Sequence, residues 1–134
     1  MALVVFATVA CTDSNGPDLS PTGTWHATRL IVTDHGTPTD ALAAGAMIGM
    51  TLTSSGTTSG SIHIPAALSE SGVEEDLSLR GTWSFGADST HISFDQAADT
   101  FIRDNPWSYD GSTLSYVAAG AGSGDMIEAT LTRE

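Results

Sequence analysis

Apolar and polar residues alternate with a period of two along much of this chain, and the alternation restricts the folds that it can adopt. The clearest case is the segment 77–85 (LSLRGTWSF), in which every second residue from Leu77 to Phe85 is apolar or glycine. A strand with one face buried and the other in water produces this pattern, because successive side chains point to opposite faces. The same alternation recurs in four further segments, which are 46–54, 60–65, 90–95 and 126–133.

Turn-forming residues separate these segments and divide the chain into about eight predicted strands. Asp110-Gly111 lies between two segments rich in aromatic residues and is typical of a hairpin turn. A short helical turn is expected between the first two strands, with Thr37 as its cap, Pro38 at its first position and Gly45 at its end. The predicted strands are 23–33, 46–54, 60–65, 77–85, 90–95, 100–109, 112–118 and 126–133.

The short connections between successive strands favour a meander rather than a more complex topology. A chain of 134 residues corresponds to one domain. We therefore predict an all-β domain in the form of an antiparallel up-and-down barrel of about eight strands, because closure removes the exposed sheet edges. A two-sheet β-sandwich is the alternative, since its strands show the same alternation.

The charge of the chain excludes one large class of partners. Sixteen acidic residues stand against four arginines, lysine is absent, and the formal net charge is -12. Such a chain repels phosphate backbones, so we expect no binding to nucleic acid. The same charge disfavours electrostatic attachment to anionic lipid.

The N-terminus combines a short apolar run with the only cysteine of the chain. Residues 1–10 are apolar except for Thr8, and ten residues are too few to span a membrane as a helix. Thr8-Val9-Ala10-Cys11 resembles the lipobox of bacterial lipoproteins, in which a small residue precedes a cysteine at the end of an apolar segment. The resemblance implies cleavage before Cys11 and lipidation of its thiol. The alternative is a frayed N-terminus with an incidental cysteine.

The residues after the cysteine have the composition of a flexible tether, with TDSNGPDLSPT at positions 12–22. We divide the chain into a signal-peptide remnant at 1–10, a lipidated cysteine with its tether at 11–22, and a barrel domain at 23–134. The resemblance to lipoproteins implies a domain in the bacterial cell envelope, held to a membrane by lipid and facing the periplasm or the cell exterior.

A second resemblance concerns the first and last predicted strands. Gly23-Thr24-Trp25 opens the first strand, and Arg133 stands at the end of the last one on its inward-facing side. A G-x-W in the first strand and a late arginine resemble the calycins, and especially the small lipocalin-like domains of bacterial lipoproteins. The resemblance implies that Trp25 and Arg133 form a cation–π pair that closes one end of the barrel.

Residue types that often form catalytic or metal-binding sites are present, but they lack the spacing of the known motifs. The segment SESGVEED at 69–76 does not have the spacing of a calcium loop and is interpreted as a solvated acidic loop. No G-x-S-x-G elbow or phosphate-binding loop is found. We predict neither an enzyme nor a cofactor or metal site. The histidines, which we interpret as solvated, are His26, His35, His63 and His91.

Two functions remain open at this point. The first is a membrane-anchored domain that binds a small apolar ligand inside the barrel. The second is a filled barrel without a ligand cavity, acting as a protein-interaction or inhibitor-like module. Inward-facing aromatic residues could line a ligand cavity or fill the core, and these residues are Trp83, Phe85, Trp107, Tyr109 and Tyr116.

Overall fold

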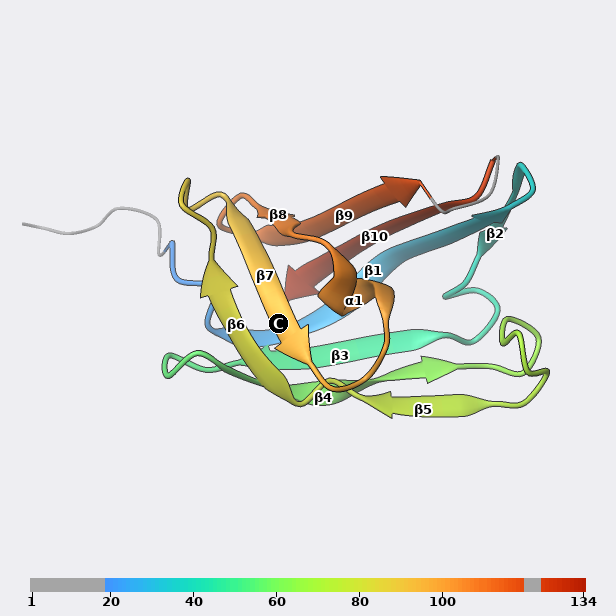
Figure 1. Ribbon diagram of the computed structural model, residues 1–134, viewed down its shortest axis with the longest axis horizontal. Helices are drawn as coiled ribbons and strands as arrows, with labels where there is room; N and C mark the ends of the chain where they lie inside the picture. Colours follow the sequence, from blue (N-terminus) through green and yellow to red (C-terminus); the bar gives the residue numbers. More distant parts are fainter. Residues whose placement is uncertain (1–18, 120–123) are drawn as a thin grey trace, which may run out of the picture.

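A computed structural model describes residues 19–119 and 124–134 and shows an all-β domain with one short helix. The strands form a single antiparallel sheet that curves round and closes on itself (Figure 1). In chain order the elements are β1 (Gly23–Asp34), β2 (Thr37–Asp40), β3 (Met47–Leu52), β4 (Thr57–Ile64), β5 (Glu75–Ser78), β6 (Gly81–Phe85), β7 (His91–Gln96), α1 (Phe101–Asp104), β8 (Trp107–Tyr109), β9 (Thr113–Ala119) and β10 (Met126–Arg133).

Eight of these strands make the barrel, in the order β1-β3-β4-β6-β7-β8-β9-β10. Pairing of β10 with β1 closes the ring, from Trp25 opposite Arg133 to Thr33 opposite Met126. The two remaining strands are additions, with β2 paired to β1 and β5 paired to β4. The predicted up-and-down barrel is therefore confirmed, and the sandwich alternative is excluded by the closure.

The segment 77–85, expected to be one strand, is divided into β5 and β6. Both halves keep the same register against β4, because Ser61 faces Ser78 and Thr58 faces Gly81. Leu79 lies at the bend between them, and its carbonyl accepts hydrogen bonds from Thr58 Oγ1 and from the side-chain amide of Gln96. These buried partners satisfy a carbonyl at the break in the strand. The bend lets β6 continue to β7 while β5 extends along β4 alone.

The expected helical turn beginning at Thr37 is wrong in position. Thr37–Asp40 is strand β2, which pairs with the end of β1, and the turn follows it at residues 41–45. Asp40 rather than Thr37 caps this turn, since its carboxylate accepts the amide N–H of Ala43 at 3.1 Å. Gly45 does end the turn, with a φ of 103°.

The expected strand at 100–109 is also only partly formed. Residues Phe101–Asp104 make the helical turn α1, and β8 is limited to Trp107–Tyr109. β7 and β8 pair through only two residue pairs, and α1 occupies the wall of the barrel where the two strands diverge. Ile102 is completely buried there and anchors the helix to the core.

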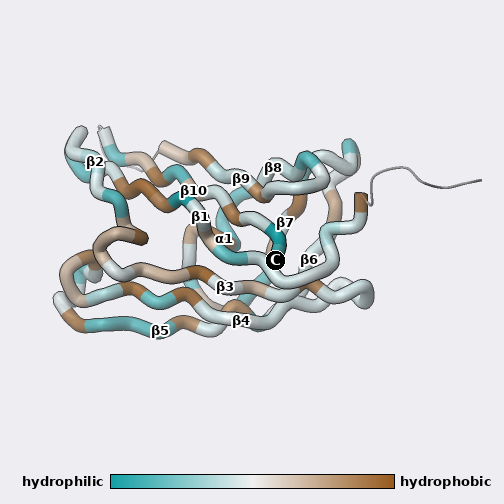
Figure 2. Tube along the Cα trace, turned by 180° about the vertical axis from the view of Figure 1, so that it is seen from behind, coloured by the Kyte–Doolittle hydropathy of each residue, from teal (hydrophilic) through white to brown (hydrophobic). Residues whose placement is uncertain are grey.

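The inward face carries the apolar positions that the alternation predicts. In Figure 2, hydrophobic and paler segments alternate along β3 and β4. Along β1 the inward positions change parity, from Trp25 and Ala27 to Leu30 and Val32, because the pairing with β10 shifts by one residue between Ala27 and Arg29. Such a bulge increases strand curvature, which helps a small barrel to close.

The two ends of the barrel differ. At one end the N-terminal segment 19–22 packs against the start of β1. At the other end β1, β4, β9 and β10 extend beyond the short β6–β8 wall, and β2 and β5 widen the sheet on both sides. We call the first the closed end and the second the open end.

Candidate functional site

Trp25 and Arg133 come together at the closed end. Trp25 is completely buried, and the guanidinium carbon of Arg133 lies 5.0 Å from the centroid of its ring system. Gly23 makes room for this contact, since a Cβ at that position would lie 3.3 Å from the Arg133 side chain. Arg133 also donates hydrogen bonds to the Ser20 carbonyl and, at 3.1 Å, to the Tyr109 hydroxyl. The pair is thus part of a polar cluster that joins both ends of the described chain.

The residues before β1 complete this cluster. Pro21 is fully buried, and its carbonyl accepts a 2.8 Å hydrogen bond from the indole N–H of Trp25. The Ser20 carbonyl accepts the Tyr109 hydroxyl at 3.0 Å. Contacts from segment 19–22 therefore cover the closed end.

The five aromatic residues considered as ligand-facing mainly pack against one another. Trp107 and Tyr116 are buried and stacked, with ring centroids 5.2 Å apart. Tyr109 is buried beside Trp25, Trp83 is half-buried, and Phe85 lies at the closed-end rim with 39% of its surface exposed. Phe85 and Tyr109 border an outer hollow of about 580 Å³ beside the closed end, and none of the five lines the cavity described below. This half of the barrel is filled.

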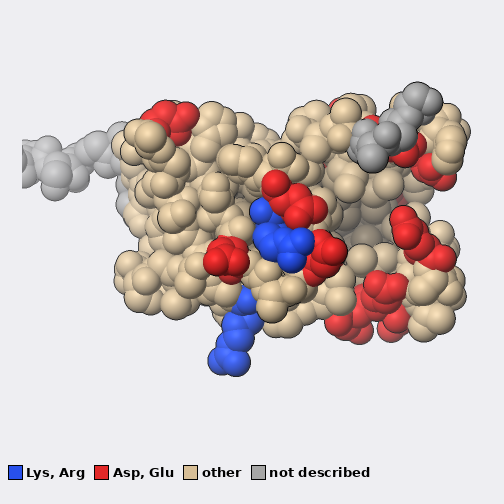
Figure 3. Space-filling model, viewed as in Figure 1, with Lys and Arg blue, Asp and Glu red and all other residues tan. Residues whose placement is uncertain are grey.

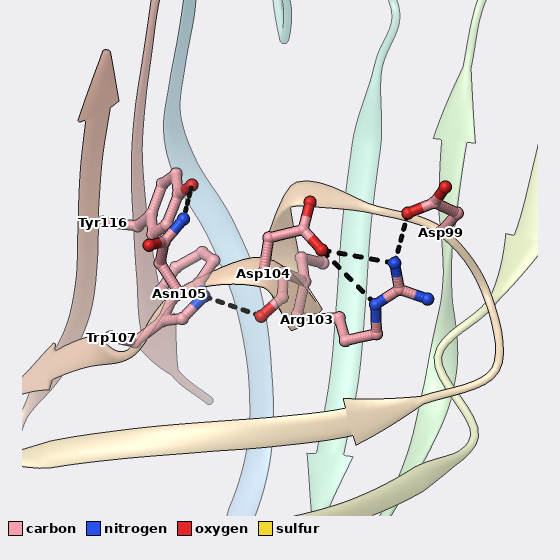
Figure 4. A network of polar contacts seen from close by, with 7 residues as sticks. Asp99, Arg103, Asp104, Asn105, Trp107 and Tyr116 are labelled. Carbon is pink, nitrogen blue, oxygen red and sulfur yellow. Dashed lines mark hydrogen bonds and ion pairs between the residues drawn. The ribbon is translucent and has the colours of Figure 1, made fainter. Parts of the chain in front are cut away.

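A network around α1 holds the wall of the barrel together (Figure 4). The Trp107 indole N–H donates to the Ile102 carbonyl at 3.2 Å, and the Asn105 amide donates to the Tyr116 hydroxyl at 3.2 Å. On the outer side, Arg103 forms ion pairs with Asp99 and Asp104. α1 is therefore fixed on its inner side by aromatic contacts and on its outer side by charge.

The open end contains a cavity of about 650 Å³. It lies between the inner faces of β4 and β5, the start of β10, α1 and the loop that joins β4 to β5. Its volume falls in the range of small-molecule sites, about 300–1,000 Å³. We call it the open-end cavity, and its apolar lining consists of Ile62, Ile64, Leu68, Leu77, Phe101 and Ile127.

Carboxylates form the rim of this cavity. Glu70, Glu75 and Asp99 line it, whereas no arginine does. Figure 3 shows acidic groups on both sides of a hollow at the open end, and on one side a basic group adjoins them. The Ser69 hydroxyl at 2.6 Å, followed by the Ser71 hydroxyl at 2.8 Å, lowers the pKa of Glu75 by hydrogen bonding to its charged form. Glu75 is therefore ionised at neutral pH.

One buried polar group of this region lacks a partner. Thr100 lines the open-end cavity with 8% of its surface exposed, and its hydroxyl makes no hydrogen bond within the described part of the chain. It occupies the position before α1, where a threonine hydroxyl often caps the helix, but it makes no such bond here. Buried hydroxyls are normally paired, so Thr100 contributes an unsatisfied polar group to the wall of the cavity, enclosed by the protein with less than 1 Å² of its oxygen exposed.

None of these lining residues was predicted to face a ligand. Ile62, Leu77 and Ile127 are apolar positions of the alternating segments 60–65, 77–85 and 126–133. Nothing in the alternation separates a filled part of a barrel from a hollow one. Glu70 and Glu75 belong to the segment 69–76, which was interpreted as a solvated acidic loop. One feature of the sequence could have indicated the site. The segment 69–76 comes directly before a strand whose inward face is apolar, and this order places carboxylates at the mouth of the barrel.

Each of the four histidines lies close to a carboxylate. His63 and His91 form hydrogen-bonded pairs with Asp76 at 2.9 Å and with Asp88 at 2.7 Å. Among the residues that the structure describes, the fold also gathers two sets of groups whose potential ligand atoms lie within 4.8 Å of one another. They are surface or half-buried groups, and such clusters do not by themselves define a metal site. The two sets are Asp34, His35 and Asp125, and His63, Glu74 and Asp76.

The expected lipidation site, Cys11, lies outside the described residues, as does the signal-peptide remnant at 1–10. Within the part that is described, no helix is long and apolar enough to cross a membrane. Comparison of the chain with protein-family models, with curated proteins and with solved structures found no match.

Proposed function

We propose that this domain binds a small, largely apolar ligand at the open end of its barrel. The observation that supports this is the open-end cavity, an open space of about 650 Å³ that six apolar side chains line. Five of these side chains are only partly buried by the protein itself, so a ligand would remove further apolar surface from water. Filling of the closed end by aromatic residues confines the ligand to the open half.

The proposal includes attachment of the domain to a membrane through a lipid on Cys11, in the bacterial cell envelope. The tether would then join the barrel at residues 19–22, which pack at the closed end. The open end is at the opposite side of the domain. A lipid-anchored molecule would therefore present its cavity away from the anchoring membrane, accessible to a ligand in the surrounding compartment.

Binding can be tested with Nile red, an uncharged dye whose fluorescence increases in apolar surroundings. We expect a saturable increase that is lost in Leu77→Trp, because the larger side chain fills the cavity. Val117→Trp is the matched control, since Val117 lies on the outer face of β9 with 69% of its surface exposed. Equal dye binding by the two variants would reject the cavity as the site and favour an interaction module without a ligand.

Attachment can be tested by metabolic labelling with a radioactive fatty acid in a bacterial host, using the gene with its own start. We expect label in the native protein and none in Cys11→Ser. Equal label in both proteins would reject lipidation at this residue. Cavity binding and lipidation are separate claims, and each test leaves the other claim standing.

A further inference from the structure

The open-end cavity combines an apolar interior with negative charge that the protein does not neutralise. Of the three carboxylates that line it, Asp99 is paired with Arg103. Glu70 forms no ion pair with any described residue, and Glu75 is held by two serine hydroxyls, which carry no charge. Two negative charges therefore remain at the mouth of an apolar space.

An adjoining hollow extends the same charge distribution. It shares Leu68, Glu70 and Ile127 with the open-end cavity and adds the carboxylates of Asp34 and Asp125. No arginine lines this hollow, and the chain has no lysine. Negative charges gathered around a cleft with apolar walls concentrate their field at its mouth, which attracts cations.

The cavity also contains uncharged polar groups, of which the Thr100 hydroxyl has no partner among the described residues. It is buried and belongs to the wall of the same cavity, close in sequence to Asp99. A hydroxyl can accept a hydrogen bond from an N–H group, which carboxylates on the rim can also do. A ligand with N–H donors would find its acceptors in the rim carboxylates.

We propose that the ligand of the open-end cavity is a cationic amphiphile, a small molecule with a hydrocarbon body and a protonated amine. This inference rests on the proposed function and specifies its ligand class. The hydrocarbon body lies against Ile64, Leu77 and Ile127, and the ammonium group lies at the rim beside Glu70 and Glu75. An anionic amphiphile, such as a fatty acid, would place its carboxylate among like charges and is disfavoured.

The test compares three ligands that share one chain length: decylamine, decanol and decanoate. Each is titrated calorimetrically at pH 7 and low salt, below the concentration at which it forms micelles. At this pH the amine is protonated, because alkylamines resemble lysine, with a pKa of about 10. We expect decylamine to bind roughly tenfold more tightly than decanol, a difference of about 1.4 kcal/mol, and decanoate to bind most weakly.

Two variants locate the effect. Glu70→Gln with Glu75→Gln should reduce the affinity for decylamine to that for decanol while leaving decanol binding unchanged. Asp95→Asn is the control for loss of a carboxylate charge. Asp95 is exposed on β7 and lines neither hollow of the open end. It should leave the preference for the amine intact. Leu77→Trp should abolish binding of both ligands.

The outcomes separate this inference from the function on which it rests. Equal binding of all three ligands, blocked by Leu77→Trp, would overturn the preference for cations and leave the ligand-binding function in place. Binding of decylamine that survives Leu77→Trp would show attraction to the acidic surface as a whole and would overturn the inference. If none of the three ligands binds, both proposals fail.

Discussion

The two ends of this barrel are built from the same strands but are finished in different ways. At the closed end, buried aromatic side chains contact one another and hydrogen-bond to the half-buried Arg133 and to the segment 19–22, and Arg133 Nε is left without a partner among the described residues. At the open end, apolar side chains are only partly covered, and one buried hydroxyl lacks a partner. The closed end is tightly packed, whereas the open end leaves a cavity between its side chains.

The difference indicates where stability and binding reside in the molecule. Close packing and paired polar groups contribute to the free energy of unfolding, and gaps reduce it. A binding site needs surface that the protein does not cover itself. We therefore expect substitutions at the closed end to reduce stability, whereas substitutions at the open end should chiefly alter ligand binding.

The largest expected effect comes from Trp25→Ala. Removal of this buried ring should lower the free energy of unfolding by about 3–5 kcal/mol, since it opens a large cavity in a packed core. Ile127→Ala at the open end is the comparison, with an expected loss of about 1 kcal/mol or less because the side chain is only partly buried and borders an existing space. Chemical denaturation measures both. Equal losses would show that the two ends are equally packed and would contradict the comparison.

A slightly smaller effect is expected when the segment 19–22 is removed. A chain that begins at residue 23 should be less stable by about 2–3 kcal/mol than one that begins at residue 19, because the Trp25 indole and the Tyr109 hydroxyl lose carbonyl partners. Both should still unfold in one cooperative transition, as expected for a barrel confined to residues 23–134. Equal stability of the two chains would show that this segment does not help to close the barrel.

Much of the difference between the two ends could not be predicted from the sequence. The alternation predicts which residues face inward, and the resemblance to calycins implied the pair of Trp25 with Arg133, whose inward parity fits that role. The break at Leu79 is not visible in the alternation, since β5 and β6 keep one register and one parity. That break lets β5 leave the ring and widens the open end. Local alternation contains no information on how far neighbouring strands diverge.

α1 was missed for a related reason. Its four residues are too few for a helical period to be recognised, and the segment DTFIRDNPW contains the aromatic and branched residues that favour strands. The helix forms because Ile102 and Phe101 fill the space between β7 and β9, which is a tertiary effect. Formation of α1 brings Thr100 and Asp99 into the cavity wall. The sequence alone therefore could not predict that these two residues belong to the site.

Arg133→Ala tests how much the contact between Arg133 and Trp25 contributes to stability at the closed end. We expect a loss of about 1–2 kcal/mol, because the cation–π contact and the packing over the ring of Trp25 disappear. In a double-mutant cycle the combined loss with Trp25→Ala should be smaller than the sum, since each change alone removes the shared contact. Arg133→Lys should recover only part of the loss, because an ammonium group lacks the planar donors that reach Ser20 and Tyr109. Strict additivity would show that the two side chains contribute independently.

The smallest expected effect is a dependence of stability on acid pH that arises mainly in the turns of the closed end. The backbone N–H of Thr90 and then the ring of His91 lower the pKa of Asp88 to about 2, and the backbone N–H of Ser112 lowers that of Asp110 in the β8–β9 turn. A carboxyl whose pKa is lower in the folded chain stabilises the fold above its unfolded value, about 3.9, and this contribution is lost as the pH falls through the folded value.

The free energy of unfolding should therefore decrease from about pH 4 to pH 2. Asp88→Asn should make this decrease shallower, whereas Asp95→Asn, which removes an exposed carboxylate without hydrogen bonds to described residues, should leave it less changed. Glu75→Gln should flatten the same curve through the open end, since Ser69 and Ser71 lower the pKa of Glu75. Urea titrations at a series of pH values measure the slopes. If Glu75→Gln flattened the curve more than Asp88→Asn, the rim of the open end would contribute more to stability than the turns of the closed end. That result would contradict the proposed difference between the two ends.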